Sequence, residues 1–440
     1  MLRFPIFSKV LMISLLALAL LIPLAMIDAK ISERQSQQRN VQSEIAQNAA
    51  GAQTIAGPYL VIDYKLIERT LVKDEKGRES TRISESAPMH AVFAPHAVNI
   101  DGHADVEIRH RGIYQARLFN LHSKIKGDFV IPSGYGLSQP IEDIIPQGAH
   151  VVLNLSDARG IRNNPVLTLN AVKHEFESGS TEPLKGNGIH ATLQPLDKSG
   201  EQHLSFELPL DLQGMATLAV APVANDTQMT LRSTWPHPSF NGRFLPRTHE
   251  MNQSGFNAYW QIPRMALNTA RDDNAPFQAE TFSIDFIDPV NIYLMSERAV
   301  KYGVMFVVLI FTAFFLFEVM NKLRIHPMQY LLVGLAMAMF FLLIISLSEH
   351  MAFLPAYAIS GMACAVLIGT YLAGALRNHK AAFGFASGIA LLYALLYGVL
   401  QSEDNALLMG TLILFVALGS VMLLTRKMDW YGFAKDQGTP

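Results

Sequence analysis

Six long apolar runs constrain what this chain of 440 residues can fold into more than any other feature of its sequence. The first run, residues 10–27, contains no charged residue, and five more follow near the C-terminus. A helix needs about 20 apolar residues to cross the roughly 30 Å of hydrocarbon in a bilayer. Because lipid offers the backbone no hydrogen-bond partner, each crossing must be helical. We therefore predict a membrane α-helical bundle of six transmembrane helices, one N-terminal and five C-terminal, the latter at residues 302–320, 330–347, 354–376, 381–400 and 406–425.

The N-terminal run has two interpretations. A cleaved signal peptide has an apolar region of about 7–15 residues that ends in a small-residue cleavage site. This run has 18 residues and ends in Ile27-Asp28-Ala29, a poor cleavage site. We therefore expect residues 1–28 to form an uncleaved transmembrane anchor, with the cleaved peptide as the alternative. Residues 29–50 are polar with widely spaced apolar positions and contain no Gly or Pro, which predicts a helical stalk that continues the anchor.

Charges in the short loops predict the orientation of the bundle, because Lys and Arg stay on the cytoplasmic side. The loops on one side contain only Glu349, Glu403 and Asp404 as charged residues. The basic residues all flank the other side, and they are Arg3, Lys9, Lys322, Arg324, Arg377, Lys380, Arg426 and Lys427. The pattern predicts a multi-pass membrane protein with both termini cytoplasmic. It assigns a five-helix bundle to residues 299–427 and a cytoplasmic tail to 428–440. It places residues of about 30–300 outside the cytoplasmic membrane, which is the periplasm if the source is a Gram-negative bacterium.

Residues 51–298 form a polar segment in which the period of the apolar pattern changes to two. Leucine and phenylalanine alternate with polar residues over 203–212, which predicts a half-buried strand, and Pro209 indicates an edge or a bulge. Similar short strands are expected at residues 59–64, 106–108, 128–131, 151–155, 166–169, 189–193, 216–220, 228–232, 258–262 and 282–286. This spacing predicts a large all-β extracytoplasmic domain of the β-sandwich type, as one unit or a stacked pair.

Charge and motifs narrow the function of the chain. Its 35 basic and 37 acidic residues offer no positive field to nucleic acid. The segment between anchor and bundle contains 11 of the 14 histidines, but not with the spacing of a metal site. P-loop, G-x-G-x-x-G, G-x-S-x-G and C-x-x-C motifs are absent as well. We therefore expect no metal, no cofactor, no nucleic-acid partner and no enzymatic activity. The expected partners are the lipid bilayer and other envelope proteins or envelope components.

One candidate contact site in the segment is residues 233–246, STWPHPSFNGRFLP. Two prolines fix their own φ angles and favour extended backbone at the residues before them. The motif is therefore expected to present Trp235, His237 and Phe240 on a stiff, extended segment, followed by a flexible turn at Asn241-Gly242. A rigid aromatic loop of this kind could bind a ligand or a partner. The interpretation that we favour is structural, with the loop closing one end of the sandwich.

A second candidate is residues 156–161, SDARGI. Asp157 and Arg159 are either paired within a turn, which is the simpler interpretation, or Arg159 meets an anion.

A third candidate is formed by acids of the bundle. Glu318 lies about one turn from the cytoplasmic end of the second span, and intramembrane acids are often functional. At this depth it could also reach the interface or pair with Lys322 four residues on. Glu349 and His350 end the third span, and with the two acids of the next loop on the same side they could relay protons or bind a cation. Ordinary solvated loop residues are the alternative.

Several stretches of the sequence resemble the CreD family of bacterial inner-membrane proteins, and the similarity runs from the N-terminal anchor to Tyr431. The stretches that carry the resemblance are SDARGI (156–161), LRSTWPHPSFNGRFLP (231–246), SGFNAYW (254–260), HPMQYLLVGL (326–335), LSEH (347–350) and MDWY (428–431). The resemblance implies a role in cell-envelope integrity and stress tolerance, including tolerance of colicin-type toxins, and control by a two-component system. It brings no accepted catalytic mechanism, so no catalytic residues are carried over.

The sequence leaves three functional hypotheses. The leading one is a non-enzymatic envelope protein whose β domain binds or senses envelope components. The second is a transporter or export accessory that uses Glu318, Glu349 and His350. The third and weakest is an envelope enzyme acting on glycan or lipid, with active groups around Trp235 and His237.

Overall fold

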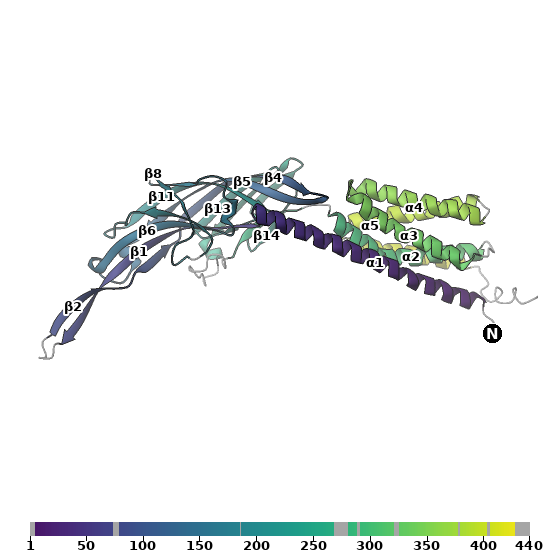
Figure 1. The fold of residues 1–440 in the computed structure, drawn as a ribbon, viewed down its shortest axis with the longest axis horizontal. Helices are drawn as coiled ribbons and strands as arrows, with labels where there is room; N and C mark the ends of the chain where they lie inside the picture. Colours follow the sequence, from purple (N-terminus) through teal and green to yellow (C-terminus); the bar gives the residue numbers. More distant parts are fainter. Residues whose placement is uncertain are drawn as a thin grey trace, which may run out of the picture. The chain divides into compact units, whose positions relative to one another are not determined.

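The computed structural model describes residues 5–73, 79–184, 186–267, 280–287, 291–320, 325–376, 379–402 and 405–426. The chain divides into two compact units, which Figure 1 shows in colours that follow the sequence. One unit combines residues 1–38 with 290–440, and the other is residues 39–289. The predicted tail, 428–440, lies outside the described residues.

Within the described residues, six helices are long and apolar enough to cross a membrane, one before and five after a large β domain. This confirms the predicted fold class. The helices are α1 (Pro5–Asn48), α2 (Ile292–Met320), α3 (Pro327–Ser348), α4 (Phe353–Leu376), α5 (His379–Gln401) and α6 (Ala406–Thr425).

Helix α1 has 44 residues and runs without interruption through the segment predicted as a stalk. At about 1.5 Å per residue it is roughly 66 Å long, about twice the thickness of the hydrocarbon layer. Its apolar half packs on the bundle through a stripe at helical spacing, Leu20, Leu24, Ile27 and Ile31, each less than 9% exposed. Leu20 lies so close to α3 that a Cβ at Gly334 would overlap its side chain.

Helix α2 begins ten residues before the span predicted from the apolar run. Its first turns contain Ser296, Glu297, Arg298 and Lys301. A span predicted from an apolar run does not include such polar residues, so the prediction began too late. The helix tolerates them because their polar groups have partners: the Lys301 ammonium donates to Glu297 at 2.6 Å, and Gln35 of α1 donates to the same carboxylate at 3.2 Å.

The β domain consists of two sheets. The first is ordered β14 (Pro238–Gly242), β17 (Phe282–Phe286), β12 (Thr217–Ala221), β1 (Gln53–Lys73), β6 (Ile144–Leu155), β10 (Gly188–Leu193) and β9 (Glu177–Ser178), with β2 (Glu79–Glu85) and β3 (Met89–Phe93) also pairing with β1. The second is ordered β15 (Thr248–Asn252), β16 (Gly255–Pro263), β13 (Asp226–Ser233), β4 (Ala97–Arg111), β5 (Tyr114–Ile131), β11 (Gln202–Met215), β7 (Val166–Leu169) and β8 (Val172–Glu175).

One hydrophobic core joins the two sheets. It contains Leu60 and Ile62 of β1 together with Ile100 of β4 and Phe129 of β5, all at most 1% exposed. The domain is therefore a single sandwich, which the sequence left open. Each predicted strand overlaps an observed one, and strand β11 shows why. Its alternate leucines and Phe206 face the core, while it pairs with β5 over fourteen consecutive residues.

Pro209 sits in β11 beyond the short stretch that pairs with β7. Its carbonyl accepts a hydrogen bond from Asn163 Nδ2 at 3.3 Å. Strand β11 lies between β5 and β7 and is not an edge strand, but Pro209, which has no N–H, falls outside the stretch that pairs with β7.

Candidate functional sites

Glu318 of α2 is 3% exposed and joins three helices. The Tyr330 hydroxyl of α3 donates to Oε2 at 2.9 Å, and the backbone N–H of Ile325 donates to Oε1 at 2.8 Å. Lys9 of α1 forms an ion pair with the same carboxylate. We call this set the Glu318 cluster. The partner predicted for Glu318, Lys322, lies outside the described residues.

Glu349, directly after α3, is the centre of a similar set, the Glu349 cluster. Its side chain is 8% exposed and lies 3.4 Å from Nε of Arg34 in α1. The Tyr293 hydroxyl of α2 donates to its Oε1 at 3.2 Å. His350 is exposed, and the two acids of the next loop lie outside the described residues.

The two clusters lie at opposite ends of α2 and α3. Lys9 and Arg34 are 25 residues apart in α1, as are Tyr293 and Glu318 in α2. At about 1.5 Å per residue this is roughly 37 Å, more than the hydrocarbon thickness of about 30 Å. Each carboxylate therefore holds α1, α2 and α3 together near one membrane interface, and the structure does not bring the two acids into one site.

The aromatic motif is fixed to the β domain at several points. The Trp235 indole N–H donates to the carbonyls of Ile287, at 3.0 Å, and His237, at 3.1 Å. The guanidinium carbon of Arg117 lies 5.8 Å from the centre of the Trp235 ring. Trp235 is half-buried, and His237 is exposed beside it, with ring centres 6.4 Å apart.

Phe240 packs inward on the aromatic side of the core. Its ring meets Trp260 edge-on at 5.6 Å and Phe256 at 5.8 Å. The prediction of a flexible turn at Asn241-Gly242 is wrong, because both residues belong to strand β14 and pair with β17. Gly242 has a φ of 89°, and a Cβ there would overlap the carbonyl oxygen of Thr281, so the glycine permits the close approach of the two strands.

Asp157 and Arg159 form a closed turn. The Asp157 carboxylate accepts from the backbone N–H of Arg159 at 3.1 Å and from its guanidinium at 2.9 and 2.6 Å. The side-chain hydrogen bond from Arg159 lowers the pKa of the Asp157 carboxyl. Arg159 also donates to the carbonyl of Gln47, at the end of α1, at 2.6 Å. The pair therefore binds the last turn of α1 within the β-domain unit.

The structure does not assemble these two motifs into one cleft. The hydrogen bonds of Trp235 go to Ser233, His237 and Ile287. Arg159 instead bonds to Asp157 and Gln47, and the Asp157 carbonyl accepts from Gln53.

Comparisons with known proteins identify the family. The family model described as "Inner membrane protein CreD" matches residues 5–431. The chain is also 35% identical over 439 residues to the inner membrane protein CreD of Escherichia coli strain K12, covering 99% of this chain and 96% of that protein. The chain belongs to the CreD family. It is thus an inner membrane protein, and its described residues include six helices that can cross the membrane.

Solved structures resemble the CreD-family chain only weakly. A Legionella pneumophila protein described as nutrient-binding has a TM-score of 0.21 at 8% identity, covering 48% of this chain and 72% of its own. An M1 zinc metallopeptidase from Deinococcus radiodurans has a TM-score of 0.19 at 7% identity, covering 44% and 42%. TM-scores this low support no inference about fold or function.

A row of polar side chains lies on the first sheet of the β domain, and the sequence pattern did not predict it. Asp63 of β1 forms a hydrogen bond with His90 Nδ1 at 2.7 Å, and its carboxylate lies 3.0 Å from His150 Nε2. The rings of His150 and His190 meet edge-on, with centres 5.8 Å apart. The four residues come from four strands, so only the strand register brings them together. Among the described residues, no group of His, Cys, Asp and Glu has the geometry of a metal site.

Replacing Gly160 with alanine tests the turn that holds α1. A Cβ at Gly160 would overlap the carbonyl oxygen of Gln213 and the amide of Gln53. We expect Gly160→Ala to lower the free energy of unfolding by about 1–3 kcal/mol, measured by chemical denaturation of the full chain in detergent. Gly200→Ala is the control, because nothing lies within 4 Å of its Cβ position. Equal effects of the two variants would show that the turn is not packed as described.

A double-mutant cycle tests the Glu318 cluster. Glu318→Gln leaves Lys9 without its ionic partner and weakens hydrogen bonds to a charged acceptor, so we expect a loss of about 1–3 kcal/mol. Lys9→Met in the same background should recover part of that loss, because it removes the unpaired charge. Glu85→Gln breaks an exposed ion pair with Lys65 and serves as the control, with a loss of at most about 1 kcal/mol. Strictly additive effects of Lys9→Met and Glu318→Gln would contradict the ion pair.

Proposed function

We propose that this CreD-family protein is a non-enzymatic envelope protein that holds its β domain in the periplasm to bind or sense envelope components, in support of envelope integrity. The proposal depends on one observation: the polar side chains that were candidates for a catalytic or binding role make structural contacts within the protein. Trp235, Asp157 and Arg159 connect elements of the β domain, and Glu318 and Glu349 connect helices. Side chains that are held in such contacts favour a structural role over a catalytic one.

The distribution of charge supports the periplasmic orientation. Lys9 and Lys380 lie at the ends of α1 and α5 that the loop charges assign to the cytoplasm. The proposal follows the positive-inside rule for both termini and for the segment between α1 and α2.

A long arm of the β domain is the surface that best fits a partner. Strands β1 and β2 pair as a two-stranded ribbon from Ile67 to Lys73, and Figure 1 shows β2 reaching beyond the other strands. Leu71 and Ile83 lie on one face of the ribbon and are 71% and 67% exposed. Exposed apolar side chains on unpaired strand edges are typical of surfaces that receive another protein.

The orientation is tested by labelling single cysteines with an impermeant maleimide. Cys364→Ala removes the native thiol, and Met265→Cys then introduces one at a β-domain position that is 96% exposed. In cells with a permeabilised outer membrane, we expect Met265→Cys to react while the inner membrane is intact. Lys380→Cys should react only after the inner membrane is opened. The reverse pattern would refute the periplasmic placement.

The function is tested by complementation of a strain that lacks the protein. We expect the strain to admit detergents and large dyes that the wild-type envelope excludes, and the wild-type chain to restore the barrier. The variant Leu71→Ser/Ile83→Ser should restore it poorly at equal protein level. Val172→Ser, at a site on β8 that is 57% exposed, should restore it fully. If the arm variant restores the barrier fully, the arm is not the partner-binding surface. If the deletion strain has a normal barrier, the proposed role in envelope integrity is wrong.

A further inference from the structure

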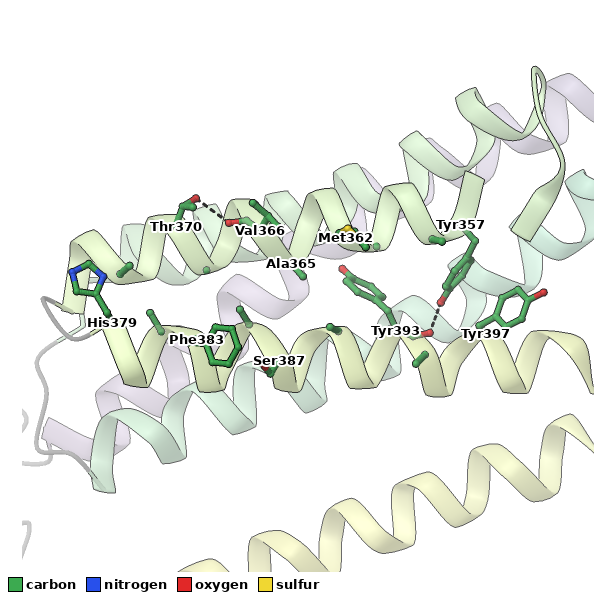
Figure 2. A pocket seen from close by; sticks show the side chains of 18 of the residues that line it. Tyr357, Met362, Ala365, Val366, Thr370, His379, Phe383, Ser387, Tyr393 and Tyr397 are labelled. Atoms are coloured by element: carbon green, nitrogen blue, oxygen red, sulfur yellow. Dashed lines mark hydrogen bonds between the residues drawn. The ribbon is translucent and has the colours of Figure 1, made fainter. Parts of the chain in front are cut away.

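Helices α4 and α5 form a groove with a volume of about 880 Å³ (Figure 2). Small residues line its length: every fourth residue from Gly361 to Ala373 on α4 is glycine or alanine, and every fourth residue from Ala382 to Ala394 on α5 is alanine. The two helices touch where a Cβ at Gly369 would lie 2.9 Å from Ala386. The groove results from this close approach combined with short side chains along its walls.

Three hydroxyl groups in the groove have hydrogen-bond partners within the protein. The Thr370 hydroxyl donates to the carbonyl of Val366 at 2.9 Å, and the Tyr357 hydroxyl donates to the carbonyl of Tyr393 at 2.7 Å. The Tyr393 hydroxyl lies 3.1 Å from the sulfur of Cys364. The groove therefore presents mainly hydrocarbon, which favours an apolar occupant over a polar substrate.

The groove has the length of a membrane and polar ends. Its α4 wall runs from Leu354 to Ala373, about 28 Å at 1.5 Å per residue, close to the hydrocarbon thickness of about 30 Å. Figure 2 shows His379 at one end and Tyr397 near the other. Lys380 is exposed next to His379. One end therefore has a positive charge and an imidazole, and the other has aromatic side chains typical of a membrane interface.

The basic end of the groove favours a lipid acyl chain as its occupant. An acyl chain of a phospholipid is joined to a headgroup phosphate, and a chain lying along the small residues would bring that phosphate to the end with His379 and Lys380.

We propose that the α4–α5 groove binds an acyl chain of an anionic phospholipid whose headgroup meets His379 and Lys380. The chain replaces bulk lipid along the small residues, and the headgroup phosphate pairs with the basic end. The site does not depend on the proposed orientation, because it is defined by the end of the groove and not by a named leaflet.

Chain-labelled lipids test the proposal. The full chain is reconstituted in phosphatidylcholine vesicles that contain a trace of spin-labelled phosphatidylglycerol or spin-labelled phosphatidylcholine, and the immobilised fraction is measured by electron paramagnetic resonance. We expect about fivefold preference for phosphatidylglycerol at low salt, the effect of one basic side chain at an anionic headgroup. The preference should fall in high salt.

Three variants locate the site. Ala390→Phe fills the groove from an exposed wall position and should lower the immobilised fraction at least twofold. Leu391→Phe adds an aromatic ring one residue away at a site that is 63% exposed and outside the groove, and should leave it unchanged. His379→Gln/Lys380→Gln should abolish the preference while keeping the chain immobilised.

Two results would overturn the proposal. One is equal immobilised fractions in wild type, Ala390→Phe and Leu391→Phe. The other is a dimer, detected by light scattering, that Ala390→Phe dissociates while lipid immobilisation stays constant, since the groove would then be an interface between copies. Both are independent of the maleimide experiment, so this proposal and the orientation can fail separately.

Discussion

A buried carboxylate is the constraint on which the arrangement of the bundle depends. Removing a charge from water is expensive unless every lone pair finds a donor. Glu318 meets this condition with donors from three places: the N-terminal helix, the segment before α3, and α3 itself. Moving any one helix along its axis would break the set. The acid therefore fixes where α1, α2 and α3 meet, although apolar packing supplies most of the contact.

The same logic is repeated at the other end of these helices. Glu349 again combines one basic residue of α1 with one tyrosine, although its tyrosine comes from α2. Between the two clusters, contact is apolar and close, as at Leu20 over Gly334. Two polar ends and an apolar middle match the layers of a bilayer, because ionic groups are tolerated near the interface and costly at the centre.

The sequence was informative where a physical requirement repeats along the chain. Length and apolarity revealed all six spans, and alternation revealed core strands such as β11. The sequence did not predict strands whose side chains face water. The five residues of β15 are all exposed and show no alternation, and β8 is also mostly exposed. Local spacing also gave no sign of Lys9 as a partner of Glu318, because the two residues are 309 positions apart in the sequence. The row at Asp63 likewise depends on strand register, which no spacing in the sequence encodes.

The link between Lys9 and Glu318 has a consequence for biosynthesis. Ribosomes add about 5–20 residues per second, so the 309 residues between the two partners take about 15–60 s to synthesise. During that interval Lys9 lacks this ionic partner, because Glu318 has not yet been synthesised. A lysine near the end of a membrane helix tolerates the lack of an ionic partner because its long side chain places the ammonium group at the interface. The ion pair that joins α1 to α2 can therefore form only after the whole β domain has been synthesised.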